Sequence, residues 1–504
     1  MIGETPILVV LAPLVGAPVA LLLGLWSRRT GWAVAALAAV AQLGLAGALA
    51  WRVVTAGAMS YATGGFALPY GIELVVDGLS AVVVGLIAVV FAAVLVYARG
   101  ARSRGTAFYS LLCLLVAGLT GMTVTGDAFN LYVFLEIAGL SAYALIASGE
   151  DADAAVAALK YLLMGTVGAS MYLLGVGLLL IVTGTLNMAD LAARVAEVGY
   201  TSPLVVAAFG LIVGGLAVKV ALFPVHTWQP DAYATAPATV ATVVSALVST
   251  VAAYALGRLL LSVFRVEFLE AVPLARTAVL AVAGGSIVAG SVLAVLQTEI
   301  RRVLAYSSVS QFGMIVAAFA IATPAAVVGG LVHLVGHAIM KGGLFATAGL
   351  VAARTGAETV EDYAGLGRRD PVGAGAFAVL ALAMVGVPPA VGFVGKWYIV
   401  VGAIEAEAWA ILALLLGSTL LTLAYFAAIV ERMYFAGETR AGPADEPAPG
   451  RPTPASDGSG SVRPSLGMVA VVVGAAVAAV ALGLLASEIE PLVRTTLEGV
   501  LAGA

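Results

Sequence analysis

The chain contains only four lysines, and each lies in or at the edge of a long apolar segment: Lys160, Lys219, Lys341 and Lys396. The polar connections use arginine instead. Arginine keeps its proton in proteins, whereas a lysine ammonium that loses its hydration can release one. Because a charge at mid-bilayer costs about 2.5 to more than 10 kcal/mol, ionisable residues there are expected to be functional. The placement predicts proton transfer, except that Lys160, beside an acidic loop, is expected to snorkel to the interface. A codon preference for arginine is the alternative, but it does not explain where the lysines lie.

A buried glutamate provides a partner for one of these lysines. Glu136 lies near the middle of the apolar segment GDAFNLYVFLEIAGLSAYALIA. If Lys219 approaches to about 4 Å at an effective dielectric near 20, the attraction is worth roughly 4 kcal/mol. Moving the lysine away would push a proton toward the glutamate, so the pair predicts a switch. A static structural ion pair is the alternative.

A proline interrupts the segment that carries Lys219, in KVALFPVHTWQPDA. Pro224 has no N–H, so the carbonyl of Val220 is left without its helical partner. Freed backbone at membrane depth is tolerated only when it is buried in protein or lines a wet cavity. His226, just beyond the proline, suits packing at a helix end and proton transfer equally.

A second interruption, in AMVGVPPAVGFVGKWY, stands in the segment of Lys396. Pro388 and Pro389 free the carbonyls of Met384 and Val385 in the same way. Two broken helices in corresponding positions indicate an inverted-repeat transporter and its site. Two structural kinks are the alternative.

Two histidines and a lysine repeat every four residues in LVHLVGHAIMKGGLFATAGL. His333, His337 and Lys341 therefore form a stripe about 12 Å long on one helix face. An imidazole accepts a proton at one nitrogen and donates from the other, so the stripe can pass protons. The metalloprotease zinc pattern needs a glutamate after the first histidine, where this chain has Leu334. We predict no metal; histidines that only pack helices remain the alternative.

The composition is that of an integral membrane protein. Of 504 residues, 62% are hydrophobic and only 10% charged, against roughly 25% charged in soluble domains. About fourteen apolar stretches are long enough to span a bilayer, so the fold class is an all-α polytopic membrane protein. Cys113 is the only cysteine, which excludes disulfides and cysteine metal sites within the chain. The net charge of −4 includes no basic run that suggests nucleic acid.

Orientation follows from the arginines of alternate short loops, which should face the cytoplasm. With an even number of helices, both termini should then lie outside. The stretch 437–465, rich in Pro, Gly and Ser, is expected to be a flexible cytoplasmic linker to a last helix over 467–487. The arginines concerned are Arg28, Arg29, Arg99, Arg102, Arg104, Arg301, Arg302, Arg354, Arg368, Arg369, Arg432, Arg440, Arg451 and Arg463.

These residues resemble a known family. The strings KVALFPVHTWQPDAY, EIRRVLAYSSVSQFGMI, HLVGHAIMKGGLF, GVPPAVGFVGKW, YVFLEIAGLSAYALI and ALKYLLMGTVGASMYLLG are similar to the antiporter-like subunits of Mrp-type cation/proton antiporters, respiratory complex I and membrane-bound hydrogenases. The similarity covers about 104–434, and TGTLNMADLA is most similar to the D subunit of the Mrp antiporters.

The resemblance implies a single membrane domain over 1–504, with two inverted five-helix repeats at about 106–262 and 272–435, each containing a broken helix. It also implies a proton relay made of Glu136, Lys219, His333, His337, Lys341 and, at the exit, Lys396.

One position departs from that family. In SALVSTVAAYALGR the family usually has a lysine where Thr250 stands. A threonine hydroxyl can bond a water but cannot hold a charge. The path at Thr250 is therefore expected to depend on water, with Ser245 and Ser249 close enough to help hold it.

Three functions are consistent with the sequence. The first is a proton-translocating subunit of a multisubunit sodium/proton antiporter in a prokaryotic cell membrane, a transporter rather than an enzyme. The second is a proton-pumping membrane subunit of a complex I-like oxidoreductase or hydrogenase. The third is a stand-alone channel or scaffold. Partners would be other membrane subunits, lipid, protons and sodium. The sequence has no cysteine cluster or dinucleotide turn, so we expect no cofactor, and redox chemistry would belong to a partner.

Overall fold

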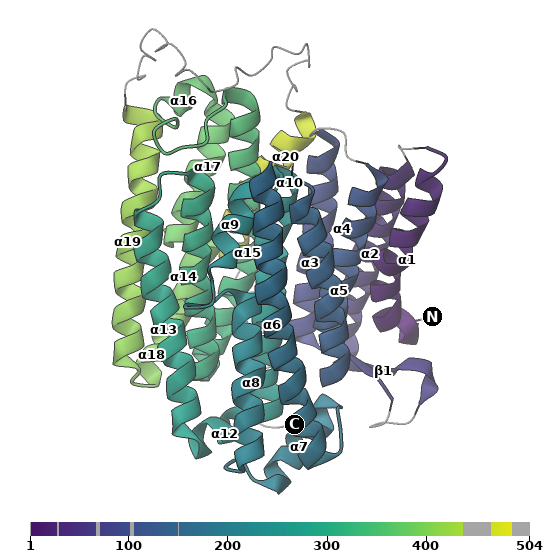
Figure 1. Cartoon of the computed structure of the whole chain (residues 1–504). Helices are drawn as coiled ribbons and strands as arrows, with labels where there is room; N and C mark the ends of the chain where they lie inside the picture. Colours follow the sequence, from purple (N-terminus) through teal and green to yellow (C-terminus); the bar gives the residue numbers. More distant parts are fainter. Residues whose placement is uncertain are drawn as a thin grey trace.

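The computed structural model describes residues 2–27, 30–66, 71–100, 105–149, 151–436 and 465–485 of this chain. These residues form an upright bundle of helices (Figure 1). Among them, thirteen helices are long and apolar enough to cross a membrane. The predicted class, an all-α polytopic membrane protein, is confirmed.

The elements follow each other along the chain with short connections. In order they are η1 Ile2–Glu4, α1 Thr5–Gly24, α2 Thr30–Ala56, β1 Met59–Ala62, η2 Thr63–Gly65, β2 Glu73–Val76, α3 Gly78–Gly100, α4 Thr106–Val124, α5 Ala128–Ala147, α6 Ala152–Thr183, α7 Met188–Val198, α8 Pro203–Val220, α9 Trp228–Thr235, α10 Ala238–Val243, η3 Val244–Val248, α11 Ser249–Arg258, η4 Leu259–Phe264, α12 Arg265–Ala271, α13 Pro273–Val295, α14 Ile300–Ile321, α15 Pro324–Thr355, α16 Leu366–Arg369, α17 Pro371–Val385, α18 Val391–Glu405, α19 Trp409–Phe435 and α20 Leu466–Leu484.

Both predicted helix breaks are present. The helix α8 ends at Val220, with Ala221 in the left-handed conformation at φ 66°, and α9 begins only at Trp228. The segment with Pro388 and Pro389 is divided into α17 and α18, each 15 residues long. Each half is too short to span the bilayer alone, since about 20 residues are needed. This division accounts for the difference between about fourteen predicted stretches and the thirteen long helices.

The span Ala238–Ala271 is continuous but irregular. Two π-helical segments, η3 and η4, interrupt its α-helical geometry on either side of α11. Single π turns inside α-helices occur frequently at functional sites.

Arginines occur at both ends of the bundle: the predicted cytoplasmic Arg368 and Arg369 at one end, and Arg194 of α7 and Arg265 of α12 at the other. The short helix α16, which contains Arg368 and Arg369, stands at the upper end in Figure 1, whereas α7, α12 and β1 stand at the lower end. Arg28, Arg29, Arg102 and Arg104 lie outside the described residues, as does almost all of the linker predicted over 437–465.

The chain directions support the two predicted repeats. The helices α4 to η4 and the helices α13 to α19 follow the same order, and in each set the broken helix comes after three long helices and one short one, α7 or α16. Corresponding helices run in opposite directions along the bundle (Figure 1). The boundaries 106–262 and 272–435 stay a prediction.

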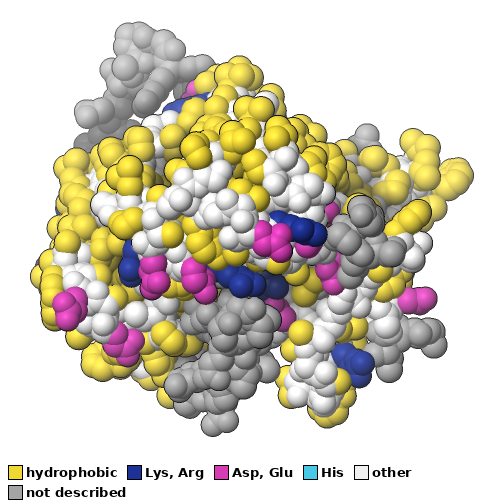
Figure 2. All heavy atoms as spheres, turned by 90° about the horizontal axis from the view of Figure 1, so that it is seen from below, with side chains coloured by type: hydrophobic (Ala, Val, Ile, Leu, Met, Phe, Trp, Pro, Cys, Tyr) yellow, Lys and Arg dark blue, Asp and Glu magenta, His cyan; other side chains and the backbone are white. Residues whose placement is uncertain are grey.

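Burial separates a lipid-facing perimeter from a central core. The span Ala238–Ala271 and the helices α14 and α15 are almost wholly buried, whereas α1, α2 and α19 bury about a third of their apolar stretch. Figure 2 shows the lower end, where hydrophobic side chains form much of the rim and charged side chains lie both in the middle and at the edge. An apolar perimeter with polar groups inside is the arrangement that a bilayer requires.

The broken helix α8 packs closely against α6 because glycines face each other. A Cβ atom at Gly215 would lie 2.7 Å from the backbone nitrogen of Tyr172 and closer still to the carbonyl oxygen of Gly168. Only a residue without a side chain allows this approach. This contact sets the position of the end of α8, which carries Lys219.

We expect Gly215→Ala to lower the thermal midpoint of the purified protein, because the added methyl must displace backbone, at a cost of about 1–3 kcal/mol. Gly210→Ala is the matched control on the same helix, since a Cβ there meets nothing within 4 Å. Its midpoint should be unchanged or higher, because alanine favours helix over glycine by roughly 1 kcal/mol. Equal effects of the two substitutions would contradict the close packing of α8 on α6.

Candidate functional site

The sequence-predicted pair forms an ion pair between two helices. Lys219 is the second-last residue of α8, and its Nζ lies 3.5 Å from Oε1 of Glu136 on α5. The same Nζ donates a hydrogen bond of 3.0 Å to the hydroxyl of Tyr143. The Lys219 side chain is buried, while a quarter of the Glu136 side chain remains accessible. The carboxylate and the phenol together replace the hydration that the ammonium loses.

Two glycines provide the space for this pair. A Cβ atom at Gly139 would lie 3.3 Å from the Lys219 Nζ, and one at Gly165 would collide with the Tyr143 hydroxyl. Sequence reasoning missed Tyr143, although its position seven residues after Glu136 puts both on one face of α5. That spacing is the signal that could have identified it.

Aromatic side chains hold the segment beyond the break. Trp228, the first residue of α9, stacks on Tyr161 of α6 with ring centroids 3.7 Å apart. Its indole nitrogen donates to the carbonyl of Val218 at 2.9 Å. Tyr161 in turn meets the ring of Tyr143 edge-on at 4.5 Å. His226 is buried between the rings of Phe223 and Tyr306.

A second polar group lies on α9 and α11. Gln229 donates to the hydroxyl of Ser249 at 3.0 Å, and Ser249 donates weakly to the carbonyl of Lys219 at 3.4 Å. Ser245 bonds the carbonyl of Thr242 at 3.2 Å. Both serines expected to hold water thus have protein partners. The hydroxyl of Thr250 is fully buried and has no partner among the described residues.

The stripe predicted on one helix face lies on α15 and is fully buried. His333 shares a hydrogen bond of 2.7 Å with Oε1 of Gln311 on α14. His337 has no hydrogen-bond partner at either ring nitrogen among the described residues, and its ring meets Phe312 edge-on. Lys341 donates to the carbonyl of Leu304 at 2.8 Å and to the hydroxyl of Ser307.

Lys396 occupies the backbone groups freed by the second break. Its Nζ donates to the carbonyls of Met384 and Val385 at 2.9 and 3.0 Å, and these are the two carbonyls whose release the prolines predict. The preceding Gly395 lies against α15, where a Cβ atom would be 2.7 Å from the Cβ of His333. The packing places Lys396 beside the His333 end of the α15 stripe.

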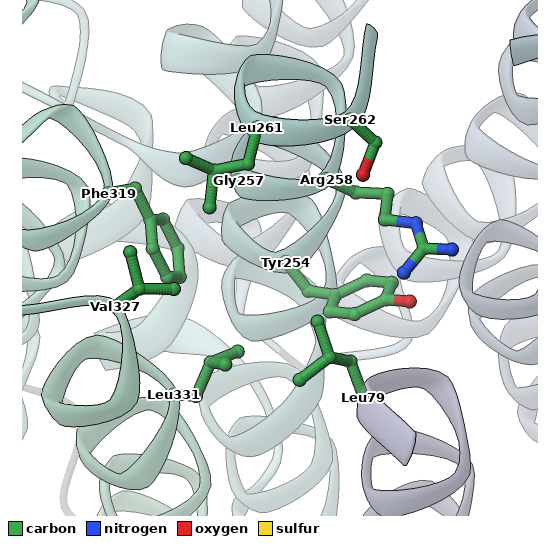
Figure 3. Close-up of a pocket in the computed structure, with 9 residues that line it drawn as sticks. All are labelled: Leu79, Tyr254, Gly257, Arg258, Leu261, Ser262, Phe319, Val327 and Leu331. Carbon is green, nitrogen blue, oxygen red and sulfur yellow. The ribbon is translucent and has the colours of Figure 1, made fainter. Parts of the chain in front are cut away.

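A buried ion pair missed by sequence reasoning lies near α11. Arg258 contacts the carboxylate of Asp77, which also accepts a hydrogen bond of 2.9 Å from the backbone of Ser80. Beside it is a pocket of about 20 Å³, with Tyr254, Arg258 and Ser262 on one wall and apolar side chains on the other (Figure 3). The Ser262 hydroxyl is buried without a partner among the described residues. A volume of this size holds about one water molecule.

The arrangement forms two groups of proton-binding side chains. Glu136 and Lys219 lie in the first half of the chain, and the α15 stripe with Lys396 lies in the second. No described hydrogen bond joins them; α11, which carries Thr250, packs against both α8 and α15. Such a site can take up, hold and release protons, with water needed wherever side chains do not touch.

Lys160 does not only snorkel to the surface. Its Nζ makes a 2.7 Å ion pair with Asp231 of α9, with 39% of its side chain accessible.

The described residues contain no group of three or more His, Cys, Asp or Glu side chains that could hold a metal ion.

A family model described as "NADH:quinone oxidoreductase/Mrp antiporter, TM" matches residues 125–422. The chain is 44% identical over 458 residues to the N subunit of the NADH-quinone oxidoreductase of Desulforudis audaxviator, covering 89% of this chain and 90% of that protein. It is 32% identical over 383 residues to the D subunit of the Na(+)/H(+) antiporter of Bacillus subtilis, covering 75% of this chain and 76% of that protein.

Three solved complexes contain a chain of similar structure. The membrane-bound sulfane sulfur reductase, an archaeal respiratory membrane complex, matches with a TM-score of 0.88 and 29% identity, over 99% of this chain and 98% of that chain. The Mrp complex from Dietzia sp. matches with a TM-score of 0.87 and 26% identity, over 99% and 97%. Respiratory complex I from Thermus thermophilus matches with a TM-score of 0.73 and 26% identity, over 96% and 98%.

We expect Lys396→Arg to reduce proton transport in vesicles at least about tenfold, because arginine keeps its proton. The guanidinium can still donate to the carbonyls of Met384 and Val385, so the substitution tests proton release rather than charge. Lys396→Glu should retain more transport than the arginine variant. Full transport by Lys396→Arg would show that a fixed charge suffices at this position.

The unpartnered hydroxyl of Thr250 is expected to bond a water in the transport path. Thr250→Val keeps the shape but removes this bond, worth about 1 kcal/mol, so the transport rate should fall roughly fivefold. Thr250→Ser keeps the hydroxyl and should transport at nearly the normal rate. The transport rates of the two variants are compared in vesicles that contain equal amounts of protein. A fully active valine variant would mean that no proton passes Thr250.

Proposed function

We propose, because this chain belongs to the NADH:quinone oxidoreductase/Mrp antiporter family, that it is the proton-translocating membrane subunit of a multisubunit complex. It is a multi-pass membrane protein with other membrane subunits as partners, as the complexes of similar structure indicate. On this proposal it moves ions and catalyses no covalent reaction of its own.

The observation that carries the proposal is the ion pair of Glu136 and Lys219 beside the first broken helix. While the ammonium stays near the carboxylate, both remain charged because each compensates the other. Withdrawal of Lys219 leaves a carboxylate with less compensation in a poorly solvated place, so it takes up a proton. The lysine then loses a counter-charge and can pass its own proton onward. The break at 221–227 gives the end of α8 the freedom that such a movement needs.

The second half supplies the remaining carriers. His333, His337 and Lys341 follow one face of α15, and Lys396 lies next to His333 through Gly395. We assign Lys396 to the exit, because the broken helix puts backbone carbonyls around its ammonium rather than a counter-charge. Waters would bridge the gaps between these groups.

We propose that the complex is a monovalent cation (sodium)/proton antiporter. The relative from Bacillus subtilis is named as the D subunit of an antiporter, and its alignment covers three quarters of both chains. The fit to the Mrp complex, at a TM-score of 0.87, is closer than the fit to complex I at 0.73, while the archaeal sulfane sulfur reductase fits equally well at 0.88. The proton gradient would then drive sodium movement.

The alternative is a proton-pumping subunit of a complex I-like oxidoreductase or a related redox complex. It is favoured by the 44% identity to a protein named as the N subunit of an NADH-quinone oxidoreductase. Purification of the tagged chain with its partners separates the two proposals. Small membrane subunits and sodium-driven proton movement without an electron donor support the antiporter, whereas iron–sulfur subunits and donor-dependent pumping support the redox complex.

We further propose that the end of the bundle that contains α16 faces the cytoplasm and that both termini lie outside. The two inverted repeats would cover 106–262 and 272–435. A reporter fused after residue 485 and read from each side of the membrane tests this orientation.

Glu136→Gln and Lys219→Ala should each abolish transport, because either change removes one half of the switching pair. Each complex is purified to check assembly, and proton movement is followed with a pH-sensitive dye in vesicles. Glu431→Gln, on the exposed end of α19, is the charge-matched control and should transport normally. Normal transport by either pair variant in an intact complex would sink the proposed switch.

A further inference from the structure

We propose that the half-helix α9 mechanically couples Lys219 in the first half of the chain to Lys341 in the second half. The coupling would pass through Asp231, which joins α9 to Lys160 on α6 and to Arg302 on α14. The two halves would then influence each other without a proton hop at Thr250. This inference rests on the proposed function and names the residues that position its two lysines.

Asp231 forms ion pairs with two cations that lie on different helices. Its Oδ2 lies 2.7 Å from the Nζ of Lys160, and its Oδ1 lies 2.9 Å from a guanidinium nitrogen of Arg302. All three side chains are about one-third accessible. A single exposed ion pair stabilises little, but one carboxylate shared by cations on two helices fixes the relative positions of three elements. Arg302 also forms an ion pair of 3.1 Å with Glu299, three residues earlier in the chain.

The neighbouring arginine attaches α9 to α14 a second time. Arg301 donates to the carbonyls of Ala234 and Ala236 at 3.2 and 3.0 Å. These carbonyls lie at the C-terminal end of α9, where a cation also balances the negative end of the helix dipole. The first turn of α14 therefore holds both the side and the end of α9.

The α6 side of these ion pairs leads to Lys219. Lys160 precedes Tyr161, whose ring stacks on Trp228 at the start of α9. Tyr161 also meets the ring of Tyr143, and the Tyr143 hydroxyl accepts the hydrogen bond of Lys219. If Lys219 withdraws, Tyr143 loses its donor and the packed rings can shift. Such a shift would be felt by α9 because interdigitated side chains move together.

The α14 side leads to Lys341. The carbonyl of Leu304 and the hydroxyl of Ser307, which hold the Lys341 ammonium, lie within two turns of Arg302 on α14. A displacement of the first turn of α14 therefore alters the place where Lys341 is bound. The beginning of α14 therefore contacts α9 through Arg301 and Arg302 and binds Lys341 a few residues later.

The shape of α9 suits a moving part. It is eight residues long and lies between the break at 221–227 and the β-region residues Ala236 and Pro237. Short elements between two such joints move as bodies in hinge transitions. The hydroxyl at Thr250 carries no charge, so electrostatic transfer through α11 has no ionisable group at that place.

A triple-mutant test measures this coupling in the intact complex. Tyr143→Phe removes one partner of Lys219, and Ser307→Ala removes one partner of Lys341. Distant sites without shared partners combine within about twofold. We expect the rate of the double variant to differ at least about threefold from the product of the two single effects. When Asp231→Asn is added to all variants, the effects should become multiplicative.

The control is Arg432→Gln, which breaks an ion pair of 2.9 Å with Glu361 and touches no part of α9. The threefold deviation should persist in that background. If Asp231→Asn prevents assembly, Lys160→Gln removes the ion pair between α6 and α9 but leaves the stack of Tyr161 on Trp228, so it should reduce the deviation.

The outcomes separate the two levels of the argument. Single variants that slow transport but multiply independently in the wild-type background would overturn the coupling through α9 and leave the proposed function standing. A deviation that survives loss of the Asp231 contacts would also overturn it. Single variants without any effect on transport would overturn the coupling as well, because neither lysine would then depend on the partner removed. The proposed switch is tested separately by Glu136→Gln and Lys219→Ala.

Discussion

The structure depends on one constraint: every polar group inside the apolar bundle needs a partner from the protein or from enclosed water, because hydrocarbon offers none. Prolines break two helices and release backbone carbonyls at that depth. Lys396 binds two of these carbonyls, Trp228 binds that of Val218 and Ser249 reaches that of Lys219. The breaks and the polar side chains around them therefore explain each other. At the second break, Lys396 supplies the donors that the missing turn no longer provides.

The same constraint makes the two halves of the chain electrostatically unequal. Lys160 and Lys219 are each matched by a carboxylate, from Asp231 and Glu136. Within the described residues, Lys341 and Lys396 are bound by hydroxyl and carbonyl oxygens only. The lysines of the first half are thus paired with carboxylates, and those of the second half are bound by neutral dipoles.

Local patterns predicted much of this molecule. Hydropathy gave the spanning segments, proline chemistry gave both breaks and the carbonyls of Met384 and Val385, and charge scarcity selected Glu136 as the partner of Lys219. The rest depends on contacts between distant segments. Gln311 meets His333 from another helix, and Asp231 turns the expected snorkelling of Lys160 into an ion pair. Neither contact has a signature in the neighbouring sequence, because the residues meet only after the helices pack. The π-helical segments were also missed, since apolar composition does not distinguish α from π geometry.

Those π-helical segments set the rotational phase of the central span. Each π turn holds one residue more than an α turn, and an α-helix advances about 100° per residue. Side chains before η3, between η3 and η4, and after η4 therefore do not follow one continuous helical face. The span presents Thr250 and Arg258 in a register that a regular helix would not give. A single-residue deletion within 244–248 that restored regular geometry would rotate everything downstream by about a quarter turn and leave the length almost unchanged. The direction in which the side chains of α11 point therefore depends on the number of residues in the π-helical segments as well as on their types.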